Sequence, residues 1–305
     1  MRVRRDEGPS GFLVVDKPAG RTSHDVVDAA RRWLGTRRIG HLGTLDPLAT
    51  GVLPLAVRDA TKLAPFVEGG RKRYEAQICL GFETDTLDAD GRVTERFAGA
   101  LPEASAVRAA LAAFAGEILQ VPPMYSAIKQ GGIPLHRLAR QGAAVERAPR
   151  PVTIHAVELV AYAPPALDIA LECSPGTYVR VLASDLGRRL GCFGHVVRLR
   201  RTASGPFTLA QAREAGVLEQ AAGAGRIAEL LLPAVEVLGL PQVRLDADDA
   251  RRVGHGGELR LAPTLLGAAG PGDRLVALDA AGTLLAVLEV GHDRLLRPLR
   301  VLAGS

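Results

Sequence analysis

Strand and helix patterns intermix irregularly along this chain, and this irregularity constrains the fold more than any other feature. Segments with the alternation or apolar character of strands lie at 11–15, 52–57, 73–80, 152–162, 166–174 and 195–201. Segments with helical periodicity lie at 24–34, 102–116, 134–140, 182–190, 209–221 and 227–237. A doubly wound parallel sheet requires strands and crossover helices in regular succession. We therefore predict an α+β fold with a mixed, mainly antiparallel sheet core and flanking helices.

Three regions are expected along the chain. Residues 1–10 are charged and indicate a flexible tail, whereas residues 11–238 have the length and apolar content of one large domain. Residues 239–305 form a small β-rich unit, in which we predict a helix over 246–253 and a hairpin over 274–290.

Local signals place the ends and faces of some elements. Ser23 precedes the first helical pattern and belongs to the residue types that cap helices, and Gly35 is suited to end that helix. In the third strand, alternation places Tyr74 on the same face as Ala76 and Ile78. Tyr74 is therefore expected to point with the apolar side of its strand.

Composition excludes several classes of protein. The chain has 305 residues, 47% of them hydrophobic, but no run approaches the roughly 18 apolar residues of a membrane span. The N-terminal residues lack the apolar core of a secretory signal, so we expect a cytoplasmic protein. Cys79, Cys173 and Cys192 lie far apart and form no metal or redox motif. The net charge of +5 is compatible with a nucleic-acid partner and equally with an ordinary soluble enzyme.

One carboxylate stands out in the segment GHLGTLDPLATGVLP, where Asp46 precedes an apolar strand. Gly40, Gly43 and Gly51 permit backbone angles that other residues avoid, and Pro47 restricts both itself and Asp46. A rigid loop of this kind would aim the carboxylate before a substrate arrives. An Asp-Pro pair is also a common way to open a turn, so the loop alone does not establish a function.

The sequence lacks the signatures of several familiar chemistries. It has no Gly-x-Gly-x-x-Gly after a strand, no phosphate-binding Gly-Lys-Ser/Thr loop, no His-Glu-x-x-His and no Gly-x-Ser-x-Gly. What remains is a set of polar residues at the ends of predicted strands, where sites are usually built. These residues are Lys17, Asp46, Tyr74, Tyr178 and Arg180.

Ordered motifs across residues 11–205 resemble the TruB family, the tRNA pseudouridine-55 synthases. The motifs are GFLVVDKPAGRTSHDVV, RRIGHLGTLDPLATGVLPLAV, ATKLAPF, KRYEAQICLGFETDTLDADG, PPMYSAIKQGG, LARQG and CSPGTYVRVLASDLG. The region after Pro241 is compatible with the small PUA-like RNA-binding domain that many family members carry. The resemblance implies isomerisation of uridine 55 in the tRNA T-loop to pseudouridine. That chemistry exchanges no atoms or electrons with another molecule, so we expect no metal, ATP or redox cofactor.

The resemblance also implies roles for individual residues. Asp46 matches the catalytic aspartate, acting as a nucleophile or as a base, and Arg180 matches the arginine that pairs with it and favours its ionised form. Tyr74 matches the tyrosine that stacks on the target uracil and can move its proton. The remaining assignments concern substrate binding. They are Tyr178 in the same pocket, His41 in the space vacated by the flipped nucleotide, Leu199 closing on the base, and Lys17 supporting the loop.

Further residues are candidates for contacts with RNA. Asp88 or Asp90 is a candidate reader of a T-loop base, because carboxylates accept hydrogen bonds from exocyclic amino groups. Leu42 departs from the small or hydroxyl residue common in the family and would alter packing without removing a catalytic group. Basic residues are candidates for phosphate contacts. They are Arg37, Arg38, Lys62, Arg71, Lys72, Lys129, Arg137, Arg140, Arg198, Arg200 and Arg201.

The sequence is also compatible with two other functions. The protein could modify another RNA, such as the rRNA or snRNA targets of related synthases, although it has no long basic tail suggestive of a ribonucleoprotein. It could also act chiefly as an RNA chaperone that refolds tRNA. We expect a monomer that binds the T stem-loop of tRNA, without metal or membrane.

Overall fold

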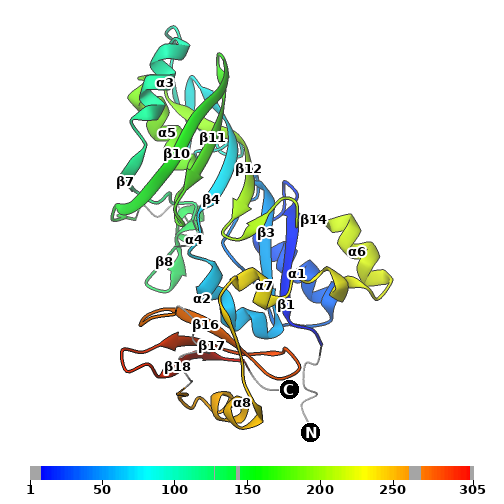
Figure 1. Ribbon diagram of the computed structural model, residues 1–305. Coiled ribbons are helices and arrows are strands. Elements are labelled where there is room, and N and C mark those ends of the chain that lie inside the picture. The colour runs from blue at the N-terminus through cyan, green and yellow to red at the C-terminus, as the bar shows by residue number, and fades with distance from the viewer. Residues whose placement is uncertain (1–7, 127, 142–144, 261–268, 303–305) are drawn as a thin grey trace.

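A mixed β-sheet forms the centre of the larger part of the protein in the computed structural model, which describes residues 8–126, 128–141, 145–260 and 269–302 (Figure 1). Its strands follow the order β14-β1-β3-β12-β4-β11-β10-β7, while β2 pairs with β3 and β13 pairs with β12. All of these pairs are antiparallel except β1 with β14 and β3 with β12. The strands are β1 (Gly11–Lys17), β2 (Ile39–His41), β3 (Thr50–Val57), β4 (Lys72–Leu80), β7 (Gly116–Gln120), β10 (Arg150–Ala163), β11 (Ala166–Cys173), β12 (Gly194–Ser204), β13 (Phe207–Thr208) and β14 (Arg213–Glu214).

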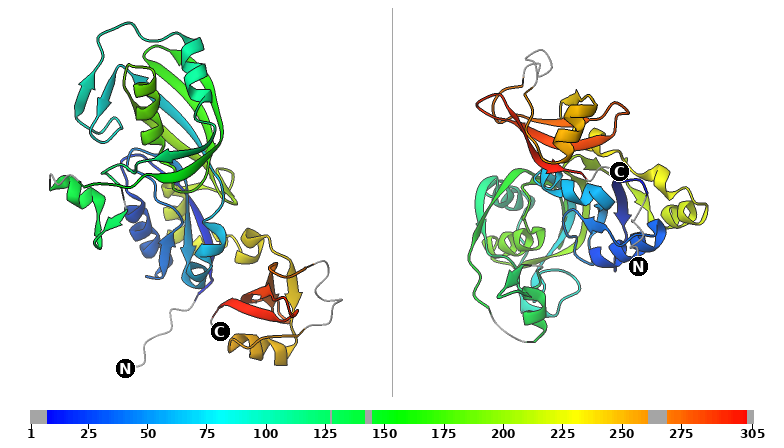
Figure 2. Two further views of the ribbon diagram at one scale, coloured as in Figure 1. Left: turned by 90° about the vertical axis from the view of Figure 1, so that its left-hand side faces the viewer. Right: turned by 90° about the horizontal axis from the view of Figure 1, so that it is seen from below.

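Helices pack against one face of this sheet and bury its apolar side chains. The main core joins Leu13 and Leu53 of the sheet with Val27, Val107 and Leu182 of the helices. Figure 2 shows these helices lying along the curved sheet. They are α1 (Ser23–Leu34), α3 (Ala104–Ala112), α5 (Val179–Arg189) and α6 (Ala215–Gly223). Outside the sheet lie the hairpins β5 (Phe82–Thr84) with β6 (Val93–Arg96), and β8 (Lys129–Gln130) with β9 (Ile133–Pro134), the latter followed by α4 (Leu135–Arg140).

A second, smaller sheet follows in the chain and packs against the larger part. Its order is β15-β16-β17-β18, with α8 (Ala247–Gly254) beside it. Val276 and Val287 of this sheet share a hydrophobic cluster with Phe12 and Val14 of β1, and the Arg274 guanidinium lies 5.5 Å from the centre of the Phe66 ring. Elements at this junction include η1 (Arg58–Leu63), α2 (Ala64–Val67) and α7 (Ala234–Leu238), and the strands are β15 (Gln242–Arg244), β16 (Arg274–Leu278), β17 (Leu284–Val290) and β18 (Leu296–Val301).

Several element ends differ from the predictions for physical reasons. Thr22, not Ser23, caps α1: its hydroxyl accepts from the Asp25 backbone N–H at 3.1 Å, and the Asp25 carboxylate accepts from the Thr22 N–H at 2.8 Å. The predicted helix over 209–221 begins only at Ala215, because residues 213–214 pair with β1.

Two other predicted helices are interrupted. The helix predicted over 227–237 is split into η2 (Ile227–Leu230) and α7, because Pro233 has no N–H and disfavours helical backbone in the residue before it. The helix predicted over 102–116 ends at Ala112, and Gly116 instead begins β7. Within the described part of the chain, no helix is long and apolar enough to span a membrane.

Candidate active site

The structure brings Asp46 and Arg180 together as a two-point ion pair. The Arg180 Nε donates to Asp46 Oδ2 at 2.8 Å, and the Arg180 Nη2 donates to Asp46 Oδ1 at 2.9 Å. The Arg180 side chain is 3% exposed, whereas that of Asp46 is 31% exposed. Charge-assisted pairs with this two-point geometry fix the plane of the carboxylate. Asp46 is therefore an oriented carboxylate that still reaches the cavity beside it.

Arg180 is itself held by the protein. It lies in the first turn of α5, where its Nη1 donates to the Thr86 carbonyl at 2.7 Å and its Nη2 to the Tyr125 carbonyl at 2.9 Å. A second carboxylate, Asp88, lies 3.6 Å from its Nε, and burial raises the pKa of Asp88. Four of the five N–H donors of the guanidinium are thus committed to protein oxygens, and the side chain is too buried to bind a phosphate.

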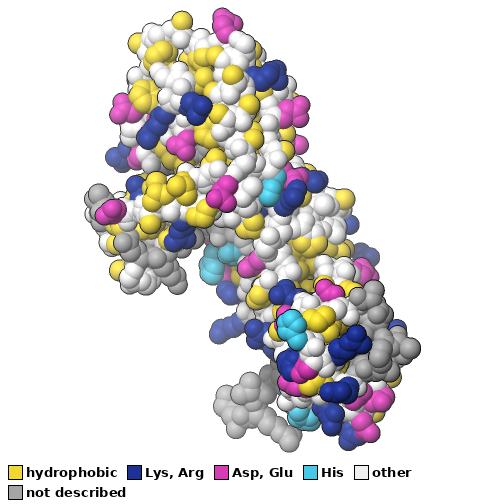
Figure 3. All heavy atoms as spheres, turned by 60° about the vertical axis from the view of Figure 1, so that its left-hand side comes forward, with side chains coloured by type: hydrophobic (Ala, Val, Ile, Leu, Met, Phe, Trp, Pro, Cys, Tyr) yellow, Lys and Arg dark blue, Asp and Glu magenta, His cyan; other side chains and the backbone are white. Residues whose placement is uncertain are grey.

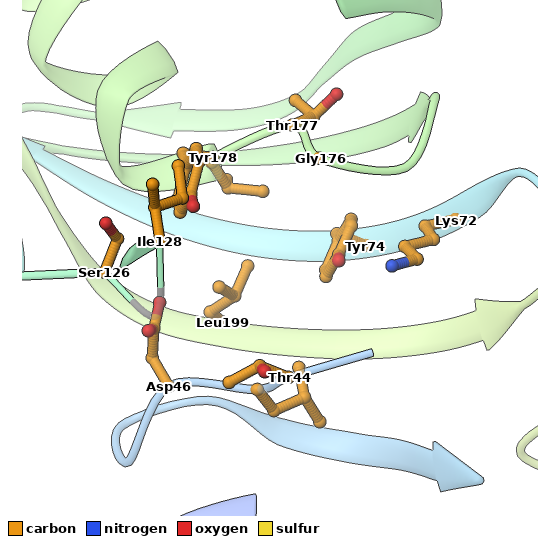
Figure 4. Close-up of a pocket in the computed structure, with 12 residues that line it drawn as sticks. Thr44, Asp46, Lys72, Tyr74, Ser126, Ile128, Gly176, Thr177, Tyr178 and Leu199 are labelled. Atoms are coloured by element: carbon orange, nitrogen blue, oxygen red, sulfur yellow. The ribbon is translucent and has the colours of Figure 1, made fainter. Parts of the chain in front are cut away.

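A cavity of about 350 Å³ opens beside Asp46. Tyr74 of β4, Leu199 of β12 and Tyr178 at the N-terminus of α5 line it together with Lys72, and Figure 4 shows Asp46 at one end of this group of side chains and Lys72 at the other. Burial raises the pKa of both phenols, which therefore stay neutral near pH 7. The cavity combines one oriented carboxylate with aromatic and aliphatic walls, an arrangement suited to chemistry on a planar ring.

Side chains from two other elements hold the Asp46 loop, residues 42–49, which joins β2 to β3. The Ser23 hydroxyl accepts from the Leu45 N–H at 2.8 Å and donates to the Leu45 carbonyl at 3.0 Å. The Lys17 Nζ donates to the Pro47 carbonyl at 3.2 Å and to two carbonyls of its own segment. Both neighbours of Asp46 are therefore fixed before a ligand binds.

Arg201 anchors the same loop from β12, which sequence reasoning did not foresee. It has no exposed surface, and its guanidinium donates to the carbonyls of Val52 at 2.8 Å, Gly43 at 3.0 Å and Thr44 at 3.3 Å. Its assignment as a phosphate contact was therefore wrong. The signal was available, because Arg201 lies two residues after Leu199 and so faces the same side of the strand.

Tyr178 is positioned by a residue that the sequence did not single out. The buried Gln120 side chain accepts from the Tyr178 N–H at 3.0 Å and donates to the Tyr178 carbonyl at 3.4 Å. A glutamine at the end of an edge strand carries no sequence signal for this role, since its partner lies 58 residues away. This contact fixes the backbone where α5 begins.

Lys17 and His41 lie outside the walls of the cavity. Lys17 is fully buried beneath the Asp46 loop, and burial lowers its pKa to about 8 although nearby Asp46 acts in the opposite direction. His41 is half-buried on β2, where its Nδ1 has no hydrogen-bond partner among the described residues, and burial lowers its pKa. The neighbouring Leu42 is buried in the cluster with Phe12 and Val52, so the loop packs on the sheet through this side chain.

The glycines around Asp46 differ in whether their backbone angles and surroundings exclude other residues. Gly51 has φ +99°, and a Cβ there would lie 2.2 Å from the Arg201 carbonyl oxygen. Gly43 has φ +94°, whereas Gly40 has an ordinary φ and open space around a Cβ. The expectation that Gly40 needs glycine's freedom was therefore wrong.

We expect Gly51→Ala to lower the free energy of unfolding by about 2–4 kcal/mol, because it adds backbone strain and a clash with a main-chain atom. Gly40→Ala is the matched control and should change it by less than about 0.5 kcal/mol. Urea unfolding of both variants measures the difference. Equal losses in the two variants would contradict the close approach of Gly51 to β12.

The remaining candidates for RNA contacts fall into distinct groups. Arg38 and Lys62 both pair with Asp59, and Arg71 pairs with Glu172. The side chains of Lys129 and Arg140 lie outside those that the structure describes. The visible face in Figure 3 carries basic side chains interspersed with acidic ones.

The two acidic candidates also differ in position. Asp88 is buried and accepts from Thr86 Oγ1 and the Asp90 N–H, which leaves it poorly placed to read a base. Asp90 is exposed and lines a separate cavity. Among the described residues, no group of three His, Cys, Asp or Glu side chains is placed to hold a metal ion.

Comparisons with known proteins match this chain over nearly its whole length. A family profile described as TruB family pseudouridylate synthase (N terminal domain) matches residues 31–179, and one described as tRNA pseudouridylate synthase B C-terminal domain matches residues 180–238. The tRNA pseudouridine synthase B of Aromatoleum aromaticum is 45% identical over 96% of this chain and 92% of its own. The protein of the same name from Dehalococcoides mccartyi is 41% identical over 96% of each chain.

Solved structures share the fold at lower identity. A chain of a Cbf5-Nop10-Gar1 complex has a TM-score of 0.69 and 24% identity, covering 96% of this chain and 84% of that one. A chain of an H/ACA RNP bound to a substrate RNA containing 2′-deoxyuridine has a TM-score of 0.69 and 22% identity, covering 96% and 85%. The predicted α+β fold with a small C-terminal β-rich, PUA-like unit is confirmed. Because the two profiles together span residues 31–238 and relatives at 41–45% identity cover almost all of it, the chain belongs to the TruB family of pseudouridylate synthases.

Proposed function

We propose that this protein converts uridine 55 in the T-loop of tRNA to pseudouridine. The observation that carries the proposal is the Asp46 carboxylate, held at two points by Arg180 at the wall of a cavity lined by Tyr74, Tyr178 and Leu199. The names of the relatives, tRNA pseudouridine synthase B, support tRNA as the substrate.

The reaction breaks the N1–C1′ bond, rotates the detached uracil and joins its C5 to C1′, while the C5 hydrogen is replaced by one at N1. Asp46 starts it beside the sugar, either by attacking the substrate or by removing a proton from it. Arg180 keeps this carboxylate oriented by bonding both of its oxygens. In both roles the detached base must stay in place, which requires walls that hold a ring in any orientation.

Tyr74 and Tyr178 supply such walls, because aromatic faces stack on a base whatever its rotation. Leu199 closes the cavity and helps to exclude water. His41 occupies the space that the flipped uridine leaves in the T-loop, and the half-buried side chain presents its exposed part to the RNA. Lys17 contributes by fixing the Pro47 carbonyl under the loop, not by touching substrate.

The proposal extends to the roles of the domains and to how the RNA reaches the cavity. We assign residues 11–238 to catalysis and 239–305 to RNA binding, with 1–10 as a flexible tail of which residues 1–7 lie outside the described chain. The T stem-loop enters from the open side of the cavity, and its target base must be flipped out at a cost of a few kcal/mol. We place this activity in the cytoplasm and assign it to a monomer without metal or other cofactor.

A paired transcript experiment tests substrate and site together. Wild-type protein should form about one pseudouridine per molecule of an unmodified tRNA transcript, and none when uridine 55 is replaced by cytidine, because the other uridines are not presented to the cavity. Mass-sensitive labelling of pseudouridine after nuclease digestion measures this. Product at the same level in the cytidine transcript would overturn the assignment of the site.

The same assay separates the two alternatives left open by the sequence. A preference for rRNA or snRNA fragments over tRNA would favour a different RNA substrate. Refolding of tRNA without any pseudouridine would favour a chaperone role alone. An active enzyme that also refolds tRNA is compatible with the proposal.

A further inference from the structure

We propose that Lys72 is a further catalytic residue, which donates a hydrogen bond to a carbonyl oxygen of the flipped uracil and stabilises the negative charge that forms there when the N1–C1′ bond breaks. This inference rests on the proposed function. It concerns the leaving base, for which no other described side chain lining the cavity supplies a positive charge.

The other cations around the cavity are already committed to the protein. Arg180 donates to Asp46 and to two carbonyls, Arg201 donates to three carbonyls, and Lys17 donates to three more. Each of these groups holds the scaffold, and none has its charge available for the base. The Lys72 ammonium forms no hydrogen bond or ion pair with any other described residue, although Lys72 lines the same cavity as Asp46.

The position of Lys72 places its ammonium inside the site. In Figure 4, Leu199 and Tyr74 lie between Asp46 at one end of the cavity and Lys72 at the other. A Cβ on Gly43 would lie 2.9 Å from the Lys72 Nζ, so the ammonium packs against the backbone of the Asp46 loop. A uracil lying along Tyr74, with its sugar at Asp46, therefore directs its far edge towards Lys72.

The chemistry requires a group of this kind. Whether Asp46 attacks the sugar or removes a proton, the electron pair of the N1–C1′ bond leaves with uracil and spreads onto the carbonyl oxygens O2 and O4. An ammonium has three donors and no acceptor, so it pairs with such oxygens. Preoriented charge in a water-poor site is among the largest contributions to catalysis. Lys72 keeps its proton, and the electron pair returns to C1′ when C5 forms the new bond.

The electrostatics of the free site agree with this role. Burial lowers the pKa of Lys72, and the charge of Arg201 adds to the effect. The surroundings of Lys72 thus disfavour the charged ammonium relative to the neutral amine. Negative charge developing on the base acts in the opposite direction, so the interaction strengthens as the bond breaks, as a catalytic contact must.

Single-turnover rates on T stem-loop RNA carrying uridine, 2-thiouridine or 4-thiouridine at the target position test the proposal. We expect Lys72→Met to slow the reaction of bound uridine RNA by about 10²-fold, while the Kd changes by less than about threefold. Sulfur accepts hydrogen bonds more weakly than oxygen. The ratio of wild-type to Lys72→Met rates should therefore shrink at least about fivefold with the thio substrate that replaces the contacted oxygen.

Controls distinguish the role of Lys72 from a general effect of charge on RNA affinity and from a failure of the proposed function. Lys62→Met removes the same charge outside the cavity, where Lys62 pairs with Asp59 at 3.0 Å, and reports what charge alone does to affinity. If wild-type protein forms no pseudouridine, the proposed function fails. If it does, any of three results for Lys72→Met would overturn the role of Lys72. The first is an unchanged rate, and the second is a loss of rate that is equal on all three RNAs. The third is a loss of RNA affinity alone, with a weaker salt dependence of Kd. Thermal unfolding of the variant checks that it folds.

Discussion

Asp46→Asn protein is expected to bind tRNA with an affinity within about threefold of wild type but to form pseudouridine at least about 10³-fold more slowly. The asparagine amide has nearly the size of the carboxylate, yet it is neutral and can neither attack the sugar nor take up a proton at neutral pH. Its oxygen can still accept one hydrogen bond from Arg180, so the loop should keep its place. Mass-sensitive labelling and equilibrium binding to the same transcript measure the two quantities.

The matched control for this variant is Asp16→Asn. Asp16 also forms a two-point pair with an arginine, since Arg200 donates to its two oxygens at 3.1 and 2.6 Å, but it does not line the cavity. Its loss should leave the rate on bound RNA unchanged. Undiminished modification by Asp46→Asn protein would refute the catalytic assignment, whichever role Asp46 has.

Arg180→Lys protein is expected to react at least about 10²-fold more slowly on bound RNA, with little change in affinity. Lysine keeps the positive charge but donates from one point, so it cannot hold both carboxylate oxygens of Asp46 and also bond the carbonyls of Thr86 and Tyr125. Arg180→Ala removes all of these bonds, and we expect a similar or larger loss of rate and a fall of about 2 kcal/mol or more in the free energy of unfolding. Single-turnover kinetics and urea unfolding measure the two effects.

Arg188→Lys provides the comparison on the same helix. Arg188 forms a two-point pair with Glu83 at 2.7 and 3.1 Å outside the cavity. That change should not slow the reaction of bound RNA. If Arg180→Lys lost affinity and rate by equal factors, Arg180 would be acting as a phosphate contact. Its 3% exposure and its four protein oxygen partners argue for the first outcome.

Structural features that depend on residues close together in the chain were predicted well from the sequence. The alternation that placed Tyr74 with Ala76 and Ile78 is confirmed in β4, where all three side chains are buried. Gly35 ends α1 with φ +59°, and the helix predicted over 246–253 is α8, capped by Asp246. Each of these features depends on residues a few positions apart, which a single sequence displays directly.

Sequence reasoning failed where a residue's partner lies far along the chain. Arg201, a basic residue on a strand, suggested a phosphate contact, yet its carbonyl partners are 149 to 158 residues away and bury it completely. Gly40 and Gly51 look alike in the sequence, but only Gly51 lies against the β12 backbone. Lys17 and Lys72 likewise differ only in what surrounds them.

The sequence by itself determined the fold class and the family, because periodicity and ordered motifs are properties of the chain, and it predicted which residues carry the chemistry. Only the tertiary structure decided how each charge is used. It commits Arg180, Arg201 and Lys17 to protein oxygens, while the Lys72 ammonium lies in the cavity without such a partner among the residues that the structure describes. The physical reason is that a hydrogen-bond donor serves the scaffold or the substrate according to which acceptors the folded chain places within about 3 Å of it.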